Sequence, residues 1–403
     1  MKNLTYKSND ASKCVKSSFW VPELDGLRAI ACFMVLIAHF NPSWLGTYSS
    51  PVFNFIKALN LGTFGVVLFF SLSSFLLTSL ALKEVGTFGK LNVKEFYIRR
   101  ILRIWPLYFL VLFISALTTW DKPSVQETYL YYVFFIGNWI PHTVSELGIL
   151  WTISVEEQFY LVFPFLFSAL LLSKRKFLII SICFILSGLA IYNVSKVGLP
   201  LSPIYYHTST YITSFVLGAW AAILFSKGKI PDLAQPIYLI PLIIILGIVL
   251  FYNPVFLWEG NNISSVLIYL SMQVIAVMIV IYVANSSGTN RASWLRYPAL
   301  RSLGVISYGI YLFHVLSHAF VNEQGMTFGH TDSNSVLIYY LLFILYISSS
   351  ISFAAFAYML WEQPFLKIRR RTTSKRDAFS WIKIAIITGT IAFVTNFILF
   401  ALG

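Results

Sequence analysis

The sequence predicts an all-α, polytopic membrane protein, and three observations lead to this fold class. Of the 403 residues, 58% are hydrophobic and only 11% are charged, whereas soluble domains carry about 25% charged residues. The mean hydropathy is +0.75. The apolar residues are gathered into stretches of roughly 20, which is the length that a helix needs to cross a bilayer.

Apolar stretches divide the chain into eleven predicted spans. They lie at residues 24–44, 62–82, 101–118, 150–172, 177–193, 207–226, 236–252, 264–284, 302–320, 336–361 and 381–402. We therefore expect four regions: a polar N-terminal segment at 1–21, a ten-span membrane domain at 22–366, a basic linker at 367–380 and an additional span at 381–403.

The distribution of basic residues predicts the orientation of the spans. Of the 29 Lys and Arg residues, all but Lys57, Lys122 and Lys196 fall in the N-terminal segment, in the even-numbered connections or at the helix ends beside them. Because cytoplasmic loops are enriched in Lys and Arg, we expect a cytoplasmic N-terminus and an extracytoplasmic C-terminus. The net charge of +13 is then a topology signal, and no nucleic-acid partner is expected.

The cysteines and the outer histidines predict no metal centre. Cys14, Cys32 and Cys183 show no paired spacing, so neither a disulfide framework nor a metal site is expected. Four histidines lie toward the outer side without a zinc-binding spacing: His142, His207, His318 and His330.

The longest outer connection, 119–149, contains the aromatic run Tyr129–Trp139. This run is too short to span a bilayer, so we expect it to lie in the interface or to dip into the bundle.

Two ionisable residues of the first span, Arg28 and His39, point to a function. They are eleven positions apart, so on a helix they share a face and are separated by about 16 Å along the axis. Ionisable groups inside a membrane helix are costly and usually mark a functional site. The pair suggests a path between the two aqueous phases.

Three further groups are expected at the depth of His39. It lies about 22 Å above the inner boundary, and Glu156 and Glu157 lie about 9 Å below the outer surface of a ~30 Å core. His314 lies about 18 Å up the ninth span. A histidine beside a carboxylate is the minimal general base with an orienting partner. The alternative is a structural one, since such residues also hydrogen-bond across helices.

A cationic cluster is expected at the inner boundary of the membrane. Arg100 and Arg103 lie three positions apart on one helix, and Arg28 is expected at a similar depth on the first span. Guanidinium groups suit phosphates, so a phosphorylated cytosolic donor such as a coenzyme A thioester would fit. Arginines at inner helix ends also act as plain topology anchors, above all Arg99. Tyr308 and Tyr311 are either hydrogen-bond donors in the site or interface anchors.

Five strings, in this order, resemble the acyltransferase-3 family of integral membrane O-acyltransferases over about residues 22–366. ELDGLRAIACFMVLIAHF resembles the opening signature, with its Arg-x10-His spacing at Arg28 and His39, and FYIRRILRIWPLYFL resembles the paired-arginine segment. LWTISVEEQFYLVFP resembles a segment that places the family glutamate at Glu156, after Trp151. ISYGIYLFH resembles the late Ser-Tyr…Tyr-Leu-x-His segment, and WEQPF the closing Glu-x-Pro.

The resemblance implies transfer of an acyl group, commonly acetyl, from cytosolic acyl-CoA to a hydroxyl of a sugar, polysaccharide or glycolipid. No metal is implied, and a bacterial cytoplasmic membrane is the expected location. Val67 stands where the family often has an acid, Ser74 where it has glycine, and Thr152 where it has serine. Some members continue into an extracytoplasmic esterase-like domain. This chain stops at Gly403, so we expect it to act alone or with a separate partner.

The residues and the resemblance together predict a membrane acyltransferase that uses acetyl-CoA as co-substrate. His39, oriented by Glu156, would act as general base or as a covalent acyl carrier, and His314 or a tyrosine would stabilise the oxyanion. We assign Tyr308, Tyr311, Glu157 and Trp151 to substrate or oxyanion contacts. The alternative is an exporter of a glycan or lipid intermediate that uses the intramembrane His and Glu as a proton relay.

Overall fold

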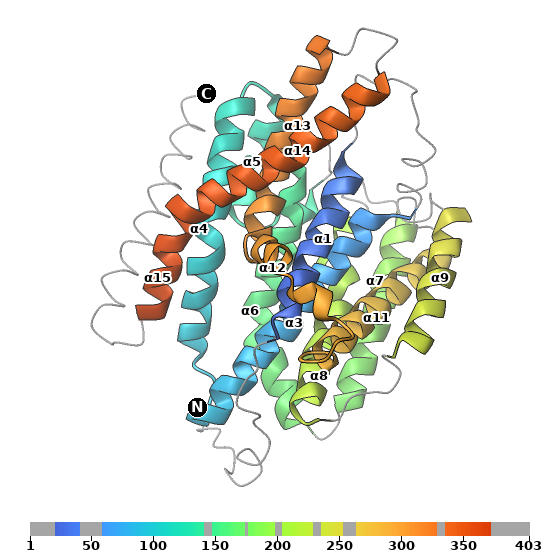
Figure 1. Cartoon of the computed structure of the whole chain (residues 1–403). Helices are drawn as coiled ribbons and strands as arrows, with labels where there is room; N and C mark the ends of the chain where they lie inside the picture. The colour runs from blue at the N-terminus through green and yellow to red at the C-terminus, as the bar shows by residue number, and fades with distance from the viewer. Residues whose placement is uncertain are drawn as a thin grey trace. The chain divides into compact units, whose positions relative to one another are not determined.

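The computed structural model describes residues 21–40, 59–140, 147–173, 176–197, 204–228, 235–252, 263–328 and 335–371, which form helices, turns and connecting loops but no strand (Figure 1). Two compact units emerge from the contacts. Unit 1 comprises residues 1–39, 49–92 and 161–305, and unit 2 comprises residues 40–48, 93–160 and 306–403. The division falls within one helix, α6 (Trp151–Leu172), between Tyr160 and Leu161.

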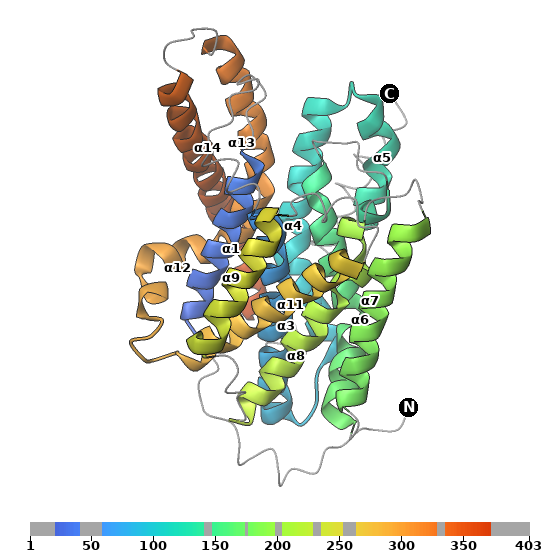
Figure 2. The same ribbon diagram turned by 90° about the vertical axis from the view of Figure 1, so that its right-hand side faces the viewer.

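Unit 1 is built around α3 (Leu61–Phe88), which packs against α8 (Ile212–Ser226), α1 (Glu23–His39) and α11 (Ile263–Asn285). The remaining elements of this unit are α7 (Lys176–Val197), η4 (Ile204–Tyr206), η5 (Thr208–Tyr211), α9 (Pro236–Tyr252), η7 (Ser293–Arg296) and α12 (Pro298–Val305). Figure 2 shows α7, α8 and α11 from the side on which they lie together.

Small residues let the helices of unit 1 approach closely. α3 begins with the string GTFG, and its Ser71 and Ser74 are fully buried. The Ser74 hydroxyl donates to the carbonyl of Phe215 on α8. Gln273 of α11 contacts the start of α8 and the preceding η5. Its Oε1 accepts from the Ser214 backbone N–H at 2.8 Å, and its Nε2 donates to the Thr210 carbonyl at 2.9 Å. The small-residue stripe therefore serves helix packing, as membrane bundles commonly use it.

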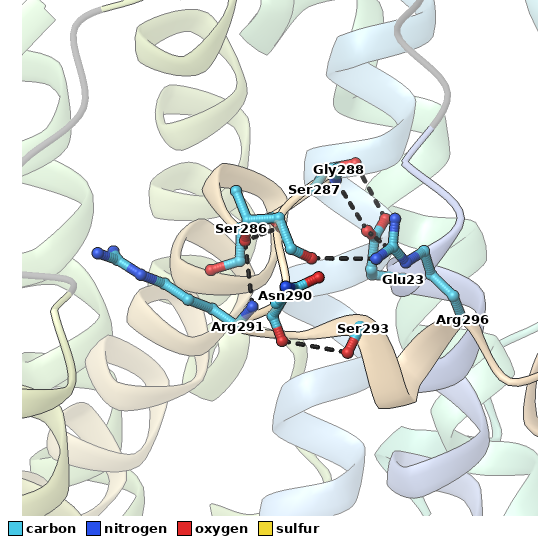
Figure 3. Close-up of polar contacts among 9 residues, drawn as sticks. Glu23, Ser286, Ser287, Gly288, Asn290, Arg291, Ser293 and Arg296 are labelled. Carbon is cyan, nitrogen blue, oxygen red and sulfur yellow. Dashed lines mark hydrogen bonds and ion pairs between the residues drawn. The ribbon is translucent and has the colours of Figure 1, made fainter.

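The start of α1 is anchored by Glu23, whose side chain is fully buried. Its carboxylate accepts hydrogen bonds from the Ser287 hydroxyl at 3.0 Å and from the Gly288 backbone N–H at 3.2 Å, and Nε of Arg296 lies 3.6 Å from Oε1 (Figure 3). Arg296 in turn donates to the Thr289 carbonyl. A single carboxylate thus fixes the whole 286–296 loop against the first helix.

We expect the Glu23→Ala variant to lower the thermal stability of the protein. The change leaves a hydroxyl, a backbone N–H and a guanidinium without their shared acceptor, which costs about 2 kcal/mol for hydrogen bonds to a charged group. The measurement is the midpoint of thermal unfolding of the detergent-solubilised protein, followed by size-exclusion chromatography. Glu127→Ala, at an exposed position of another helix, is the matched control. Equal midpoints for the two variants would contradict the anchoring role.

Unit 2 contains the helices that carry most of the predicted site residues. They are α4 (Val93–Thr119), the first part of α6, α13 (Ser307–Phe328), α14 (Ser335–Ala357), the π-helical turn η8 (Tyr358–Glu362) and α15 (Gln363–Arg371). α13 and α14 pack along each other, as both views show (Figures 1 and 2). Three short elements complete this unit: α5 (Pro123–Val133), η2 (Gly137–Trp139) and η3 (Gly148–Leu150).

Helices occupy the positions of the first ten predicted spans. Among the described residues, six helices are long and apolar enough to cross a membrane, or seven if α12 and α13 are taken as one span. The ninth predicted span is broken at Ile306, between these two helices. Helix α1 is described over 17 residues, and α7 and α9 are shorter apolar helices. The eleventh predicted span lies outside the described residues.

Candidate active site

The predicted site residues belong to four helices. Arg28 and His39 lie on α1 in unit 1, while the others lie on α4, α6 and α13 in unit 2. α1 contains both of its residues in one uninterrupted helix, so their predicted eleven-residue separation on one face holds. The predicted pairing of His39 with Glu156 involves both units and stays a prediction.

His39 is the last residue of α1 and its side chain is exposed. Its ring Nδ1 lies 2.8 Å from the Val35 carbonyl one turn earlier. A carbonyl can only accept, so Nδ1 carries the proton in the neutral ring and the lone pair is on Nε2. The nitrogen able to take a proton from a substrate is therefore Nε2. Arg28 is partly buried.

In unit 2, α6 carries two successive carboxylates, Glu156 and Glu157, and the second contacts α4. The Trp105 indole N–H donates to Oε2 of Glu157 at 3.1 Å. Glu156 and Arg100 both lie close enough to Glu157 to interact with it electrostatically. The predicted phosphate-binding Arg100 therefore faces a carboxylate of its own unit.

A second acid–arginine pair lies beside the first. Glu362, the last residue of η8, is buried and interacts electrostatically with Arg103. This glutamate was predicted only as part of the closing Glu-x-Pro motif. Its position in a π-helical turn marks it further, since such turns occur often at functional sites.

Tyr308 connects the two pairs. Its hydroxyl donates to the Ile104 carbonyl of α4 at 2.9 Å, and the carboxylates of Glu362, Glu157 and Glu156 all interact electrostatically with it. Trp361, next to Glu362, donates to the Pro106 carbonyl at 2.8 Å. One turn of α4 thus carries the contacts that bring α13 and η8 to the carboxylates.

A second polar level lies further along α13, against the start of α6. The Thr152 hydroxyl donates to the Tyr311 hydroxyl at 2.9 Å, and Tyr311 also reaches the Ile149 carbonyl at 3.3 Å. His314 is fully buried, and its Nδ1 is hydrogen-bonded to the Tyr311 carbonyl. In the neutral ring the lone pair is therefore on Nε2. The adjacent Trp151 is buried at the first position of α6.

These two levels replace the single layer that the sequence predicted for Glu156, Glu157 and His314. The carboxylates lie with Arg100 and Tyr308, whereas His314 is six residues beyond Tyr308 on α13, a rise of about 9 Å. The difference arises from the pairing of α13 with α6, because Tyr308 lies near the carboxylates whereas Tyr311 reaches Thr152, nearer the start of α6. Helix α4 also begins at Val93, before the predicted start of its apolar stretch, so Arg100 and Arg103 lie inside the helix rather than at its end.

Two polar contacts of this unit were not predicted. The first is the hydrogen bond from Trp105 to Glu157. Its signal was that Trp105 is the only tryptophan in its string of arginines and aromatic residues, and a buried indole N–H usually needs an acceptor. Gln158 donates from Nε2 to the Phe135 carbonyl and to Oδ1 of Asn138, both at 2.8 Å. A glutamine directly after two glutamates inside an apolar span was the available signal. Among the described residues, no group of His, Cys, Asp and Glu is arranged to hold a metal ion.

Comparison with known proteins supports the resemblance inferred from the motifs. The model of the acyltransferase-3 family, described as an acyltransferase domain, matches residues 21–359. A candidate O-acetyltransferase of Staphylococcus aureus (strain COL) is 29% identical over 398 residues, covering 92% of this chain and 62% of that protein. Among solved structures, none matches this chain.

Two further relatives carry more specific names. A candidate peptidoglycan O-acetyltransferase of Bacillus subtilis (strain 168), YrhL, is 29% identical over 329 residues, or 73% of this chain and 48% of its own length. The O-acetyltransferase OatA of Staphylococcus aureus (strain NCTC 8325 / PS 47) is 28% identical over 331 residues, or 75% and 51%. The chain thus spans about half to three fifths of the length of these relatives. With its membrane-length apolar helices and a family match over most of its length, the chain is an integral membrane protein of the acyltransferase-3 family.

Proposed function

We propose that this protein is an O-acyltransferase that moves an acetyl group from acetyl-CoA to a hydroxyl of a cell-surface carbohydrate, with peptidoglycan as the first acceptor to test. The observation that carries the proposal is the set of ionisable residues inside apolar helices at the family's motif positions. Placing carboxylates, arginines and a histidine, each buried or partly buried, inside the apolar helices of one unit is costly unless they serve a function. The names of OatA and YrhL support the choice of acceptor.

The donor is proposed to bind through arginines. Arg100 and Arg103 lie about one turn apart on the same face of α4, and each has a carboxylate beside it. An arginine has five N–H donors, so one that faces a carboxylate keeps donors for a phosphate oxygen. Arg28 is proposed as the third residue that contacts the nucleotide. The bacterial cytoplasmic membrane is the proposed location, since it gives access to cytosolic acetyl-CoA.

The chemistry is proposed to centre on His39. Its Nε2 takes the proton of the acceptor hydroxyl while the oxygen attacks the thioester carbon, and the thiolate of coenzyme A leaves. In the covalent alternative, Nε2 first accepts the acetyl group and then passes it to the hydroxyl. Glu156 is proposed to support His39 in either route. His314, with its lone pair on Nε2, would donate to an oxyanion only in its protonated form, so Tyr311 is the simpler donor.

The decisive experiment supplies purified protein in lipid nanodiscs with radiolabelled acetyl-CoA and peptidoglycan fragments. Label is expected in an ester that mild base removes from the sugar. Teichoic acid, lipopolysaccharide fragments and glycolipids extend the acceptor panel. Protein that moves no label to any of these acceptors, yet transports one of them across proteoliposome membranes, would overturn the proposal in favour of an exporter.

We expect the Arg100→Gln variant to raise the KM for acetyl-CoA about tenfold to a hundredfold while changing the KM for the acceptor little. A charge-assisted hydrogen bond to a phosphate stabilises binding by about 1.5–3 kcal/mol, and each 1.4 kcal/mol is a factor of ten. Arg99→Gln, next to it on the same helix, is the matched control because Arg99 fits a topology anchor. An equal rise in both variants would argue against a specific phosphate contact.

A further inference from the structure

Phe135 has a backbone conformation that a bulky residue rarely adopts. Its φ is +56°, and only Asn60 shares a positive φ among the described residues other than glycine. A phenylalanine in this left-handed region costs free energy, and such residues persist where the surroundings hold them, often at functional sites.

The surroundings of Phe135 hold it from both sides. Its backbone carbonyl accepts from Nε2 of Gln158, which also binds the fully buried Asn138. Its ring packs against Tyr108, Trp105 and Phe109 of α4, with centroids 4.6, 5.6 and 5.8 Å away. The turn is therefore tied to α6 by its backbone and to α4 by its ring.

Two neighbours of Phe135 fix the same turn. The Tyr108 hydroxyl donates to the Tyr132 carbonyl at 2.7 Å. A Cβ at Gly137 would overlap the Tyr132 ring, so only glycine fits there. These contacts restrict the 132–138 segment to one arrangement on α4.

The ring that Phe135 covers is the one that holds Glu157. Trp105 donates its indole N–H to Oε2 of Glu157. The other carboxylate oxygen, Oε1, is buried and has no hydrogen-bond partner within the described part of the chain. A buried carboxylate oxygen without a donor costs free energy, so a donor from outside the protein would be bound there favourably.

We propose that Phe135, Gln158 and Trp105 are positioning residues that present Oε1 of Glu157 to a hydroxyl of the carbohydrate acceptor. The inference rests on the proposed function and deepens it, since it assigns an acceptor contact to Glu157. The contact is a hydrogen bond from a sugar hydroxyl to the carboxylate, and no covalent bond is made or broken. Trp105 fixes one oxygen, Phe135 fixes the Trp105 ring, and Gln158 fixes the Phe135 backbone.

A double-mutant cycle tests this assignment. Trp105→Phe keeps the ring packing and removes the N–H donor, and Glu157→Gln removes the charge of the acceptor oxygen while keeping the shape. We expect each single variant to lower kcat/KM for the acceptor, about tenfold for Trp105→Phe and more for Glu157→Gln. The double variant should be no worse than Glu157→Gln alone, because Trp105 acts through Glu157.

Phe135→Gly gives a second arm, since glycine adopts a positive φ without strain and only the ring is lost. It should resemble Trp105→Phe, both alone and in the Glu157→Gln background. The KM for acetyl-CoA should stay unchanged in Trp105→Phe and Phe135→Gly, whereas Glu157→Gln is judged by its acceptor kinetics, because Glu157 also interacts with Arg100. Trp139→Phe and Glu127→Gln, at exposed positions, are the matched controls.

The outcomes separate the two proposals. Losses that multiply in the double variant would overturn the positioning role while the acetyl transfer of the wild type stands. So would a rise in the KM for acetyl-CoA, in Trp105→Phe or Phe135→Gly, as large as the rise in the KM for the acceptor. A wild-type protein that transfers no acetyl to any acceptor would overturn the proposed function itself, and the acceptor contact with it.

Discussion

The His39→Ala variant is expected to show at least a hundredfold loss of acetyl transfer, with unchanged yield and unfolding midpoint. A general base contributes about 10²–10⁴ to a rate, and a covalent acyl carrier contributes all of the relay route. The unfolding midpoint is expected to remain that of the wild type, because His39 is exposed at the end of α1 and its ring is hydrogen-bonded to a carbonyl of its own helix. The measurement is the rate of label transfer from acetyl-CoA to the acceptor.

His142→Ala serves as the control for a histidine that the sequence predicts at the outer surface. Transfer at the wild-type rate by His39→Ala would refute both proposed roles of His39. Incubation with labelled acetyl-CoA alone then separates the two routes, because only a covalent relay leaves acetyl on the protein. Non-additive losses of His39→Ala and Glu156→Gln would show that the two residues act on the same step.

The Gly304→Ala variant is expected to be the most destabilising single change, with a loss of folded protein during expression. α12 approaches the start of α1 so closely that a Cβ at Gly304 would overlap the Asp25 carbonyl oxygen, and η7 approaches it so closely that a Cβ at Gly26 would overlap the Leu295 carbonyl oxygen. Backbone atoms cannot rotate away as a side chain can. Overpacking costs about 1–3 kcal/mol and occasionally more, and here two helices must separate to relieve it.

Gly188→Ala is the matched control, because a Cβ there meets Val266 and Leu270 at ordinary contact distances of 3.6 and 3.8 Å. Alanine also favours a helix over glycine, so this control should fold as well as the wild type or better. The readout is the fraction of monodisperse protein after solubilisation and its unfolding midpoint. Gly304→Ala with a wild-type midpoint would show that the two helices can separate at little cost.

The positions of the helices in the first ten apolar stretches were predictable because the length of a membrane-spanning stretch is set by the bilayer, although only six or seven of the described helices have the length and hydropathy of a span. The break at Ile306 was not predictable, since the apolar character continues across it and the short α12 differs only by its arginine and serine. Helix α5 was missed because its aromatic residues suggested an interfacial run. Pro123 at its first turn was the available signal, since proline is favoured at that position.

The predicted residues of the site were easier to choose than to place. Motif spacing selected Arg100, Glu156, Tyr308 and His314, and the fold puts all four in one unit. Their positions along the helix axes depend on where each helix begins and on how far each side chain reaches. Hydropathy encodes neither quantity. The Trp105–Glu157 hydrogen bond and the conformation of Phe135 depend on contacts between segments remote in sequence, so no local pattern predicts them.

The proline within α4 has a consequence for how this unit can vary among related proteins. Pro106 lacks an N–H, so the helix loses one internal hydrogen bond there. In the same turn, the main-chain carbonyl oxygens of Ile104 and Pro106 accept hydrogen bonds from the Tyr308 hydroxyl and the Trp361 indole N–H. Because the acceptor for Tyr308 is a backbone carbonyl, the apolar side chain at residue 104 can be exchanged without loss of this hydrogen bond. The residues that must be kept are the two donors, Tyr308 and Trp361, because phenylalanine at either position would keep the ring packing but lose the hydrogen bond.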